Sequence, residues 1–373
     1  RPVLLAARNA HKALLYAAAL LDFDIRWLWP SAQAEGALCS CPVTAEALAG
    51  ALHALAQQGI SPFGVYVTSP DYLGGMQDIP ALAAVCRAQG VPLLVDNAHG
   101  AYLHFLPQNC HPIAQGAAMC CDSAHKTLPV VTGGAYLHLA HDAPVQDEAA
   151  VRGALALFGS TSPSYLILQS LDVCNAVLAG EYPQRLAQCC AALEGLRRSL
   201  NKAAAARQCP VPLAVAGAQQ EPMKLTLDAA ALGCTGTALA EALRRAQLEC
   251  EYADPRYVVL MFTPENPPQD YTRLQTALEQ LLAAVPAGLP RPENRAGEFA
   301  ALQQQAVQRC TIRQAVLGAQ VRVPVHKALG RVCAMPTVSC PPAIPVAVSG
   351  EEITPAAIAL MQRYGIEELS VLR

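Results

Sequence analysis

Residues 120–140 read CCDSAHKTLPVVTGGAYLHLA and contain the lysine from which the rest of the chain can be interpreted, Lys126. Lysine side chains normally lie at the protein surface. Lys126 instead follows a histidine and precedes an apolar run that Gly133 and Gly134 interrupt, which is the composition of an interior segment. A solvated surface role is the ordinary alternative, so the neighbouring segments must decide between the two.

The segments around this stretch alternate between short apolar runs and amphipathic runs. Strands are expected at 1–7, 64–70, 92–96 and 133–140, and helices at 11–22 and 78–90. Strands that alternate with helices at this spacing predict an α/β fold with a mainly parallel sheet covered on both faces.

The second half of the chain has a different pattern. Two long helices are expected within 164–206, meeting near Gly180, and they are followed by strands at 223–229 and 257–264 and helices at 236–247 and 270–285. Residues 286–297 are rich in proline and glycine and predict a linker. We therefore expect a large domain over 1–165, connecting helices over 166–206, a small α/β domain over 207–290 and a C-terminal domain over 291–373.

Composition excludes several classes of function. The 373 residues are 53% hydrophobic and 15% charged, with a formal net charge of −3, so the chain is globular and has no electrostatic reason to bind nucleic acid or an anionic membrane. No apolar run approaches the roughly 18 residues that cross a bilayer. The 15 cysteines include no Cys-x-x-Cys pair. We expect reduced cysteines, no metal site and a cytoplasmic protein.

A carboxylate ends one of the expected strands. Asp96 directly follows four apolar residues, and ligands of open parallel sheets bind beyond the carboxyl ends of the strands. A strand-terminal aspartate is equally often a helix cap or a loop residue. Paired with Lys126, however, it meets the needs of pyridoxal 5′-phosphate (PLP). The lysine can bond to the cofactor aldehyde, and the carboxylate can keep the pyridine nitrogen protonated.

Six motifs carry a family resemblance. They are RNAHKALL (8–15), PDYLGG (70–75), LLVDNAHGAYLHF (93–105), DSAHKTLPVVTGGAYLH (122–138), STSPSYLILQSLD (160–172) and PPAIPVAVSGEEIT (341–354). In this order they resemble the Orn/Lys/Arg decarboxylases. The resemblance implies the PLP fold type I, which is aspartate-aminotransferase-like: a large domain with a mainly parallel sheet, then a small α+β domain and a C-terminal segment.

The resemblance also implies roles for the residues around the cofactor ring. Lys126 would bond to PLP, and Asp96 would pair with the pyridinium nitrogen. His11 matches a histidine that stacks on the ring and can pass protons near Cα, although an ordinary helix-start histidine is the alternative. Ala98 would lie near the other face of the ring, and His99 would lie close by with no assigned role.

Other matching positions concern the phosphate and the partner subunit. Ser123 and His125 match positions that contact the phosphate. The turn with Ser160, Thr161 and Ser162 opens a long helix and would reach the phosphate of a partner subunit, which implies a homodimer. Simple helix capping is the alternative for these hydroxyls.

The C-terminal motif implies a substrate contact, and the N-terminus departs from the family. Glu351 matches a glutamate that would attract the distal cation of the substrate, with a solvated surface acid as the alternative. The family carries a long N-terminal stretch whose Gly-Ser/Thr-rich turn cradles the phosphate, whereas seven residues precede Arg8 here. We therefore expect an N-terminally truncated chain with weakened cofactor binding.

The implied function is a lyase of polyamine metabolism: PLP-dependent decarboxylation of arginine, lysine or ornithine to the corresponding amine. Another PLP reaction, such as that of an aminotransferase or another lyase, uses the same lysine and aspartate and stays open. So does a catalytically impaired homologue or fragment. The sequence does not distinguish among the three basic substrates.

Overall fold

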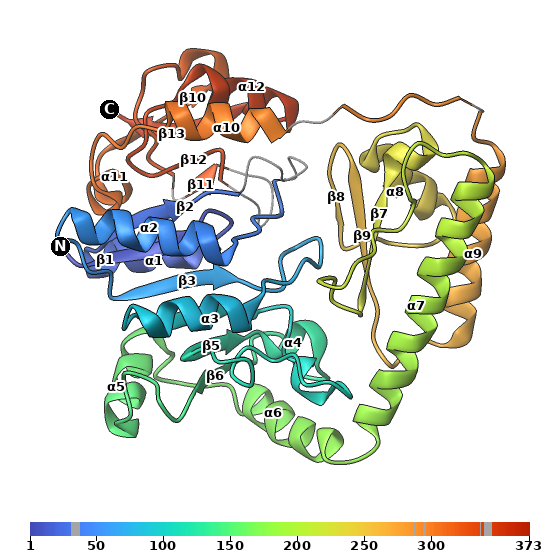
Figure 1. The fold of residues 1–373 in the computed structure, drawn as a ribbon, viewed down its shortest axis with the longest axis horizontal. Helices are drawn as coiled ribbons and strands as arrows, with labels where there is room; N and C mark the ends of the chain where they lie inside the picture. The colour runs from blue at the N-terminus through green and yellow to red at the C-terminus, as the bar shows by residue number, and fades with distance from the viewer. Residues whose placement is uncertain (31–37, 287, 294–295, 336, 339–344) are drawn as a thin grey trace.

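A six-stranded sheet organises the N-terminal part of the molecule (Figure 1). The computed structural model describes residues 1–30, 38–286, 288–293, 296–335, 337–338 and 345–373. In the order β2-β1-β3-β4-β5-β6, the strands are β2 (Asp24–Leu28), β1 (Val3–Ala7), β3 (Gly64–Thr68), β4 (Leu93–Asp96), β5 (Met119–Asp122) and β6 (Tyr136–Leu139). Strands β1 to β5 run parallel, and β6 pairs antiparallel with β5.

The two faces of this sheet pack against different helices, because successive side chains of a strand point to opposite faces. On β1, Leu5 and Ala7 join a core with residues of α2 (Ala45–Gln57) and α3 (Ile79–Ala88). Leu4 and Ala6 join a second core with α1 (Lys12–Leu21) and α11 (Ile312–Leu317). Burial on both faces explains why these strands are continuous apolar runs.

Two strands of the sheet are absent from the expected set. β2 is an edge strand with little burial, and its sequence DIRWL mixes charged with apolar residues. β5 has four residues, MCCD, and its cysteines and terminal carboxylate hide the apolar signal. The expected segments 1–7, 64–70, 92–96 and 133–140 each contain a strand.

A second, antiparallel sheet has the order β7-β9-β8 and follows two long helices (Figure 1). The helices are α6 (Tyr165–Leu178) and α7 (Tyr182–Ala206), and they meet around Gly180 as expected. The strands are β7 (Lys224–Asp228), β8 (Tyr252–Ala253) and β9 (Tyr257–Met261), with helices α8 (Gly236–Arg245) and α9 (Pro268–Ala283). Leucines of α7 and α9 share one core with β7 and β9.

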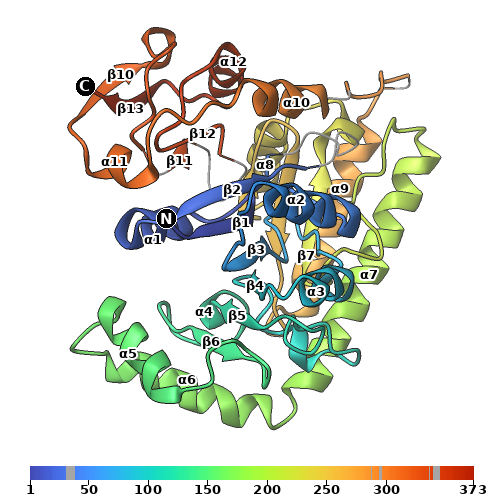
Figure 2. The same ribbon diagram turned by 60° about the vertical axis from the view of Figure 1, so that its left-hand side comes forward.

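The C-terminal segment lies beside β1 and β2 (Figures 1 and 2). Its elements are α10 (Ala296–Gln305), α11, β10 (Gln320–Pro324), β11 (Thr337–Val338), β12 (Ala347–Val348), α12 (Pro355–Arg363) and β13 (Glu368–Leu372). β10 pairs antiparallel with β13, and β11 with β12. The four domain boundaries stay a prediction, as does the location of the protein in the cell.

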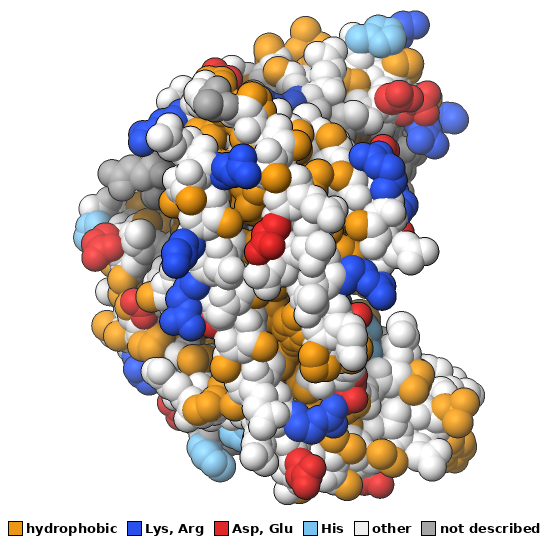
Figure 3. All heavy atoms as spheres, turned by 90° about the vertical axis from the view of Figure 1, so that its right-hand side faces the viewer, with side chains coloured by type: hydrophobic (Ala, Val, Ile, Leu, Met, Phe, Trp, Pro, Cys, Tyr) orange, Lys and Arg blue, Asp and Glu red, His pale blue; other side chains and the backbone are white. Residues whose placement is uncertain are grey.

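Two surface properties bear on function. Among the described helices, none is both long enough and apolar enough to cross a membrane. On the face that contains α7 and α9, lysine and arginine side chains are scattered among polar and apolar ones and do not form a continuous basic patch (Figure 3).

Candidate active site

Asp96 lies at the carboxyl end of β4 and is buried, with 7% of its surface exposed. Its Oδ2 accepts a hydrogen bond from the hydroxyl of Tyr66 at 3.0 Å, and its Oδ1 accepts one from the Ala98 N–H at 3.1 Å. Burial and the Asp96 charge raise the pKa of Tyr66 well above its usual value, so the phenol keeps its proton. These two partners, and the Cys121 thiol 3.9 Å from Oδ1, are therefore all neutral donors to the buried carboxylate.

Lys126 belongs to a single helical turn, α4 (Ala124–Thr127), which begins after β5. Its Nζ lies 3.3 Å from Nε2 of His99, a buried ring. Burial, and then the positive charges of Lys224 and Lys126, lower the pKa of His99 well below its usual value. The neutral ring can accept from Lys126 Nζ at Nε2, which leaves the proton on Nδ1, a buried atom with no hydrogen-bond partner among the described residues.

His11 caps the first turn of α1, where its Nδ1 accepts from the Ala13 N–H at 3.2 Å. Its pKa is lowered, first by desolvation; the charge of Asp96 opposes this shift and that of Lys126 adds to it. The partly exposed His11 ring thus lies within the electrostatic influence of both residues. His11 therefore caps helix α1 and is also influenced by the charges of Asp96 and Lys126, so a capping role and a role in the active site do not exclude each other.

Gly133 and Gly134 allow the backbone conformation of the segment that follows Lys126. Gly133 has φ +103°, which side-chain-bearing residues rarely adopt, and a Cβ on Gly134 would collide with Val130. The Gly134 carbonyl accepts from His125 Nδ1 at 2.9 Å, which leaves Nε2 of that ring for another partner. Ser123, the N-cap of α4, makes no capping hydrogen bond with its side chain. Both predicted phosphate ligands thus retain an uncommitted polar group at these positions.

The turn with Ser160, Thr161 and Ser162 is exposed and lies between α5 (Glu148–Phe158) and α6. The Ser162 N–H donates to Ser160 Oγ at 3.1 Å, whereas the N-cap of α6 is Ser164. These three hydroxyls therefore do not cap α6, and they are available to a partner from outside the chain.

Glu351 lies in a different environment from the predicted one. Arg8, with 0% exposure, donates to both Glu351 carboxylate oxygens at 2.7 Å, and its guanidinium lies over the rings of Trp27 and Trp29 at 4.9 and 4.6 Å. Glu351 is itself buried. A carboxylate that is already paired in this way does not offer its charge to a substrate cation, so Glu351 is left out of the proposed substrate site. Residues 341–344 of the same motif lie outside the described residues.

Two tyrosines near the site were missed by the sequence analysis. Tyr66 lies between valines in β3, so nothing in the sequence marks it as a site residue. Tyr72 packs edge-on against His99, with ring centroids 5.2 Å apart, and its hydroxyl donates to Glu251 at 2.7 Å. The motif PDYLGG, which contains Tyr72, is the signal that could have found it.

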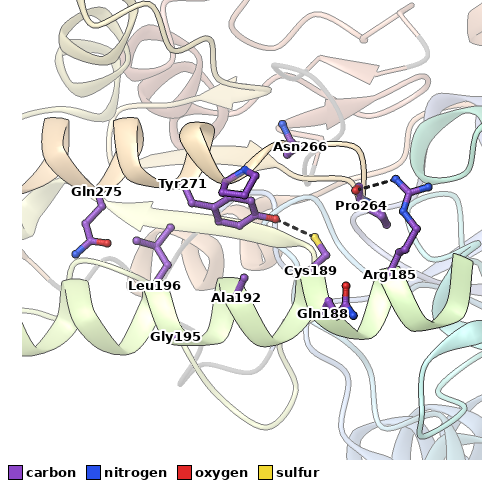
Figure 4. Close-up of a pocket in the computed structure, with 11 residues that line it drawn as sticks. Arg185, Gln188, Cys189, Ala192, Gly195, Leu196, Pro264, Asn266, Tyr271 and Gln275 are labelled. Carbon is purple, nitrogen blue, oxygen red and sulfur yellow. Dashed lines mark hydrogen bonds between the residues drawn. The ribbon is translucent and has the colours of Figure 1, made fainter. Parts of the chain in front are cut away.

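A separate groove of about 520 Å³ lies between α7 and α9 (Figure 4). Its polar contacts link α7 to α9 and to the segment before α9: Cys189 Sγ lies 3.2 Å from the Tyr271 hydroxyl, and Arg185 donates to the Pro264 carbonyl at 3.1 Å. None of the predicted site residues lines this groove. We therefore treat it as separate from the candidate active site.

Comparison with known proteins identifies relatives. Residues 2–224 match the family described as Orn/Lys/Arg decarboxylase, major domain. The uncharacterised protein YaaO of Bacillus subtilis is 28% identical over 96% of this chain and 73% of its own length. An arginine decarboxylase of the same organism is 28% identical over 78% of this chain, and the match spans 59% of that relative.

Solved structures share the fold over the whole chain. The constitutive lysine decarboxylase of Escherichia coli has a TM-score of 0.74 at 18% identity, covering 100% of this chain and 67% of that protein. The lysine decarboxylase LdcF of Francisella novicida has a TM-score of 0.76 at 17% identity, covering 100% and 66%. These likenesses confirm the predicted α/β fold type I.

Proposed function

The chain belongs to the Orn/Lys/Arg decarboxylase family, whose members are PLP-dependent amino-acid decarboxylases, and we propose that it converts a basic amino acid into the corresponding amine. The observation that carries the proposal is that a buried carboxylate and a partly buried lysine both have neutral partners at the carboxyl edge of the sheet. Asp96 accepts from a phenol and an amide, and Lys126 contacts a neutral imidazole.

This arrangement fits PLP. A buried carboxylate whose hydrogen bonds come from neutral donors remains available to a cationic partner such as a pyridinium N–H. His99 adds a buried ring nitrogen that has no partner in the part of the chain that the structure describes, a donor that a bound oxygen would satisfy. When bound, PLP supplies an electron sink for the electrons that remain on Cα as CO2 leaves.

The residues of the chain divide the work as follows. Lys126 would hold the cofactor through its aldehyde, because an amine can bond to a carbonyl group. Asp96 would keep the ring nitrogen protonated, and Tyr66 orients the Asp96 carboxylate. His11, whose pKa is lowered, is neutral at pH 7 and can cover the ring and deliver a proton near Cα. Ser123 and the Nε2 of His125 bind the phosphate.

The test is product analysis with PLP and arginine, lysine or ornithine. Release of CO2 with formation of the amine supports decarboxylation, and the relative kcat/KM values assign the substrate. Formation of a keto acid would instead establish an aminotransferase. The Lys126→Ala variant should lose both the visible absorbance band of bound PLP and the activity. If neither the wild-type band nor any product is observed, the chain is the catalytically impaired homologue.

The second part of the proposal is a homodimer. Leu157, Phe158, Tyr165 and Leu166 are 79%, 62%, 85% and 72% exposed, and they flank the Ser160–Ser162 turn. Monomeric proteins rarely expose such an apolar cluster. A second copy that covers this apolar cluster would place its phosphate site next to the three hydroxyls of the turn.

Mass measurement in solution tests the dimer. We expect twice the chain mass for the wild type and a shift toward the monomer for Leu166→Glu. Leu317→Glu, at a leucine of similar exposure on α11, is the matched control. A wild-type protein that stays monomeric at high concentration would contradict this part of the proposal.

A further inference from the structure

We propose that His111, Asp122 and His138 form a binding site for one divalent transition-metal ion, with Zn²⁺ as the expected ion. His111 Nε2 lies 3.1 Å from Asp122 Oδ2, and His138 Nε2 lies 3.0 Å from the same oxygen. The three ligand atoms all lie within 4.8 Å of one another. Two imidazoles and one carboxylate are a donor set of zinc and related ions.

The sheet explains why these residues meet. Cys120 of β5 is the cross-strand partner of His138 on β6, and Asp122 lies two residues further along the same face. His111 comes from the loop that leads into β5. This face is the one that carries Leu93, Val95 and Cys120 in the core with α2 and α3. Asp96 belongs to the opposite face, so the proposed metal site is separate from the cofactor site.

The spacing suits a metal ion after a small adjustment. Zinc–nitrogen and zinc–oxygen bonds of about 2.0–2.2 Å in a tetrahedron separate neighbouring ligand atoms by roughly 3.3–3.5 Å. The two nitrogen–oxygen distances here are 3.0 and 3.1 Å, so each need open by only a few tenths of an ångström. An ion would replace the two protons that now lie between the rings and the carboxylate.

The surroundings hold the carboxylate as a metal ligand requires. Asn97 Nδ2 donates to Asp122 Oδ1 at 2.7 Å and leaves Oδ2 to face the imidazoles. Burial raises the pKa of Asp122, but hydrogen bonds from both histidines and Asn97 outweigh it and bring the pKa to about 2. The Ile113 N–H reaches His111 Nδ1 at only 3.4 Å, so little is lost when metal binding moves the ring proton to that atom.

The carboxylate of the proposed site is buried. Asp122 is 2% exposed, and its ion-pair partners within the described parts of the chain are the two imidazoles of the proposed ligand set. Cys120 Sγ, 3.7 Å from His111 Nε2, adds a soft donor nearby and favours zinc or cobalt over magnesium or calcium.

An ion can reach these ligands from solvent. A cavity of about 540 Å³ is lined by His104, His111, Asp122 and His138, and the His138 side chain is 39% exposed. The sequence analysis predicted no metal because the three ligands lie on two strands and a loop, without the closely spaced pair that marks zinc motifs in a sequence.

The test is metal binding by the purified full chain after chelator treatment. We expect one Zn²⁺ per chain in competition with a chromophoric chelator, and Co²⁺ should give the visible absorption of a tetrahedral or five-coordinate site. Zn²⁺ should also raise the Tm of the metal-free protein. His111→Gln and His138→Gln should each weaken binding at least tenfold and abolish the Tm shift.

A matched control separates this site from adventitious binding by the many cysteines. His104→Gln removes a histidine of the same cavity whose Nδ1 pairs with Asn109 and which lies outside the ligand set. It should bind Zn²⁺ like the wild type. His138 is partly exposed, so His138→Gln keeps the test valid if a variant at a more buried position fails to fold. Equal affinity and equal Co²⁺ spectra in the wild type and His138→Gln would overturn the proposal.

Discussion

Two buried carboxylates at one edge of the large sheet have different hydrogen-bond partners. Asp96 ends β4 and is held by a phenol and a backbone amide, whereas Asp122 ends β5 and is held by two imidazoles and an amide side chain. Both are buried, and they lie on neighbouring strands. Their side chains face opposite sides of the sheet, so one edge can carry two separate ligand sites. The kind of partner, rather than burial alone, indicates what each carboxylate can bind.

The largest effect is expected at Asp96. Asp96→Asn keeps the shape of the side chain but removes the charge that holds a proton on the cofactor ring. Decarboxylation should fall by about 10²–10⁴-fold, the range for a positioned acid–base group. The measurement is kcat for CO2 release at saturating PLP. Asp78→Asn, at the exposed cap of α3, is the control. Equal rates for Asp96→Asn and the wild type would show that Asp96 has no part in catalysis.

A third buried carboxylate, Glu351, pairs with a buried arginine and is expected to contribute to stability rather than to ligand binding. Arg8→Ala removes the guanidinium and leaves Glu351 buried and unpaired, which should lower the free energy of unfolding by about 3–5 kcal/mol. Denaturant titration measures this loss. Arg1→Ala, which breaks the exposed pair with Asp24, should change stability by less than about 1 kcal/mol. If the two variants lose the same stability, the buried Arg8–Glu351 pair contributes no more to stability than the exposed pair does.

Asp122 should affect how the free energy of unfolding of the metal-free protein changes at acid pH. Its pKa is lowered from 3.8 to about 2 in the folded state, so its stabilising contribution is present above pH 4 and is lost as the pH falls toward 2. The contribution is about 2 kcal/mol. Unfolding of the wild type and Asp122→Asn should therefore differ in slope between pH 4 and 2. Parallel curves over that interval would contradict the assignment.

The smallest effect is expected at Tyr66. Tyr66→Phe removes one neutral donor to Asp96 and leaves the Ala98 N–H in place, which corresponds to about 1 kcal/mol for one hydrogen bond. We expect a roughly fivefold to tenfold decrease in kcat/KM with unchanged product. A loss as large as that of Asp96→Asn would mean that the phenol itself takes part in proton transfer.

The fold and part of the candidate site could be predicted from local pattern. The apolar runs of β1, β3 and β4 identify themselves because both faces of a parallel sheet are buried. β2 and β5 were not predicted because an edge strand and a strand that ends in polar site residues lack that apolar pattern. Asp96 was found because it ends an apolar strand, and Lys126 because a lysine is unusual in an interior-like segment. The structure brings both into the electrostatic surroundings of His11.

The sequence by itself predicted the alternation of strands with helices and singled out Lys126 and Asp96, because these follow from neighbours within a few residues. Only the tertiary structure decided that Glu351 pairs with Arg8, a contact between positions 343 residues apart. It also decided that His111, Asp122 and His138 meet on one face of the sheet. The physical reason is that burial, ion pairing and ligand geometry depend on which strands become neighbours and which face each side chain takes, and spacing along the chain does not encode either directly.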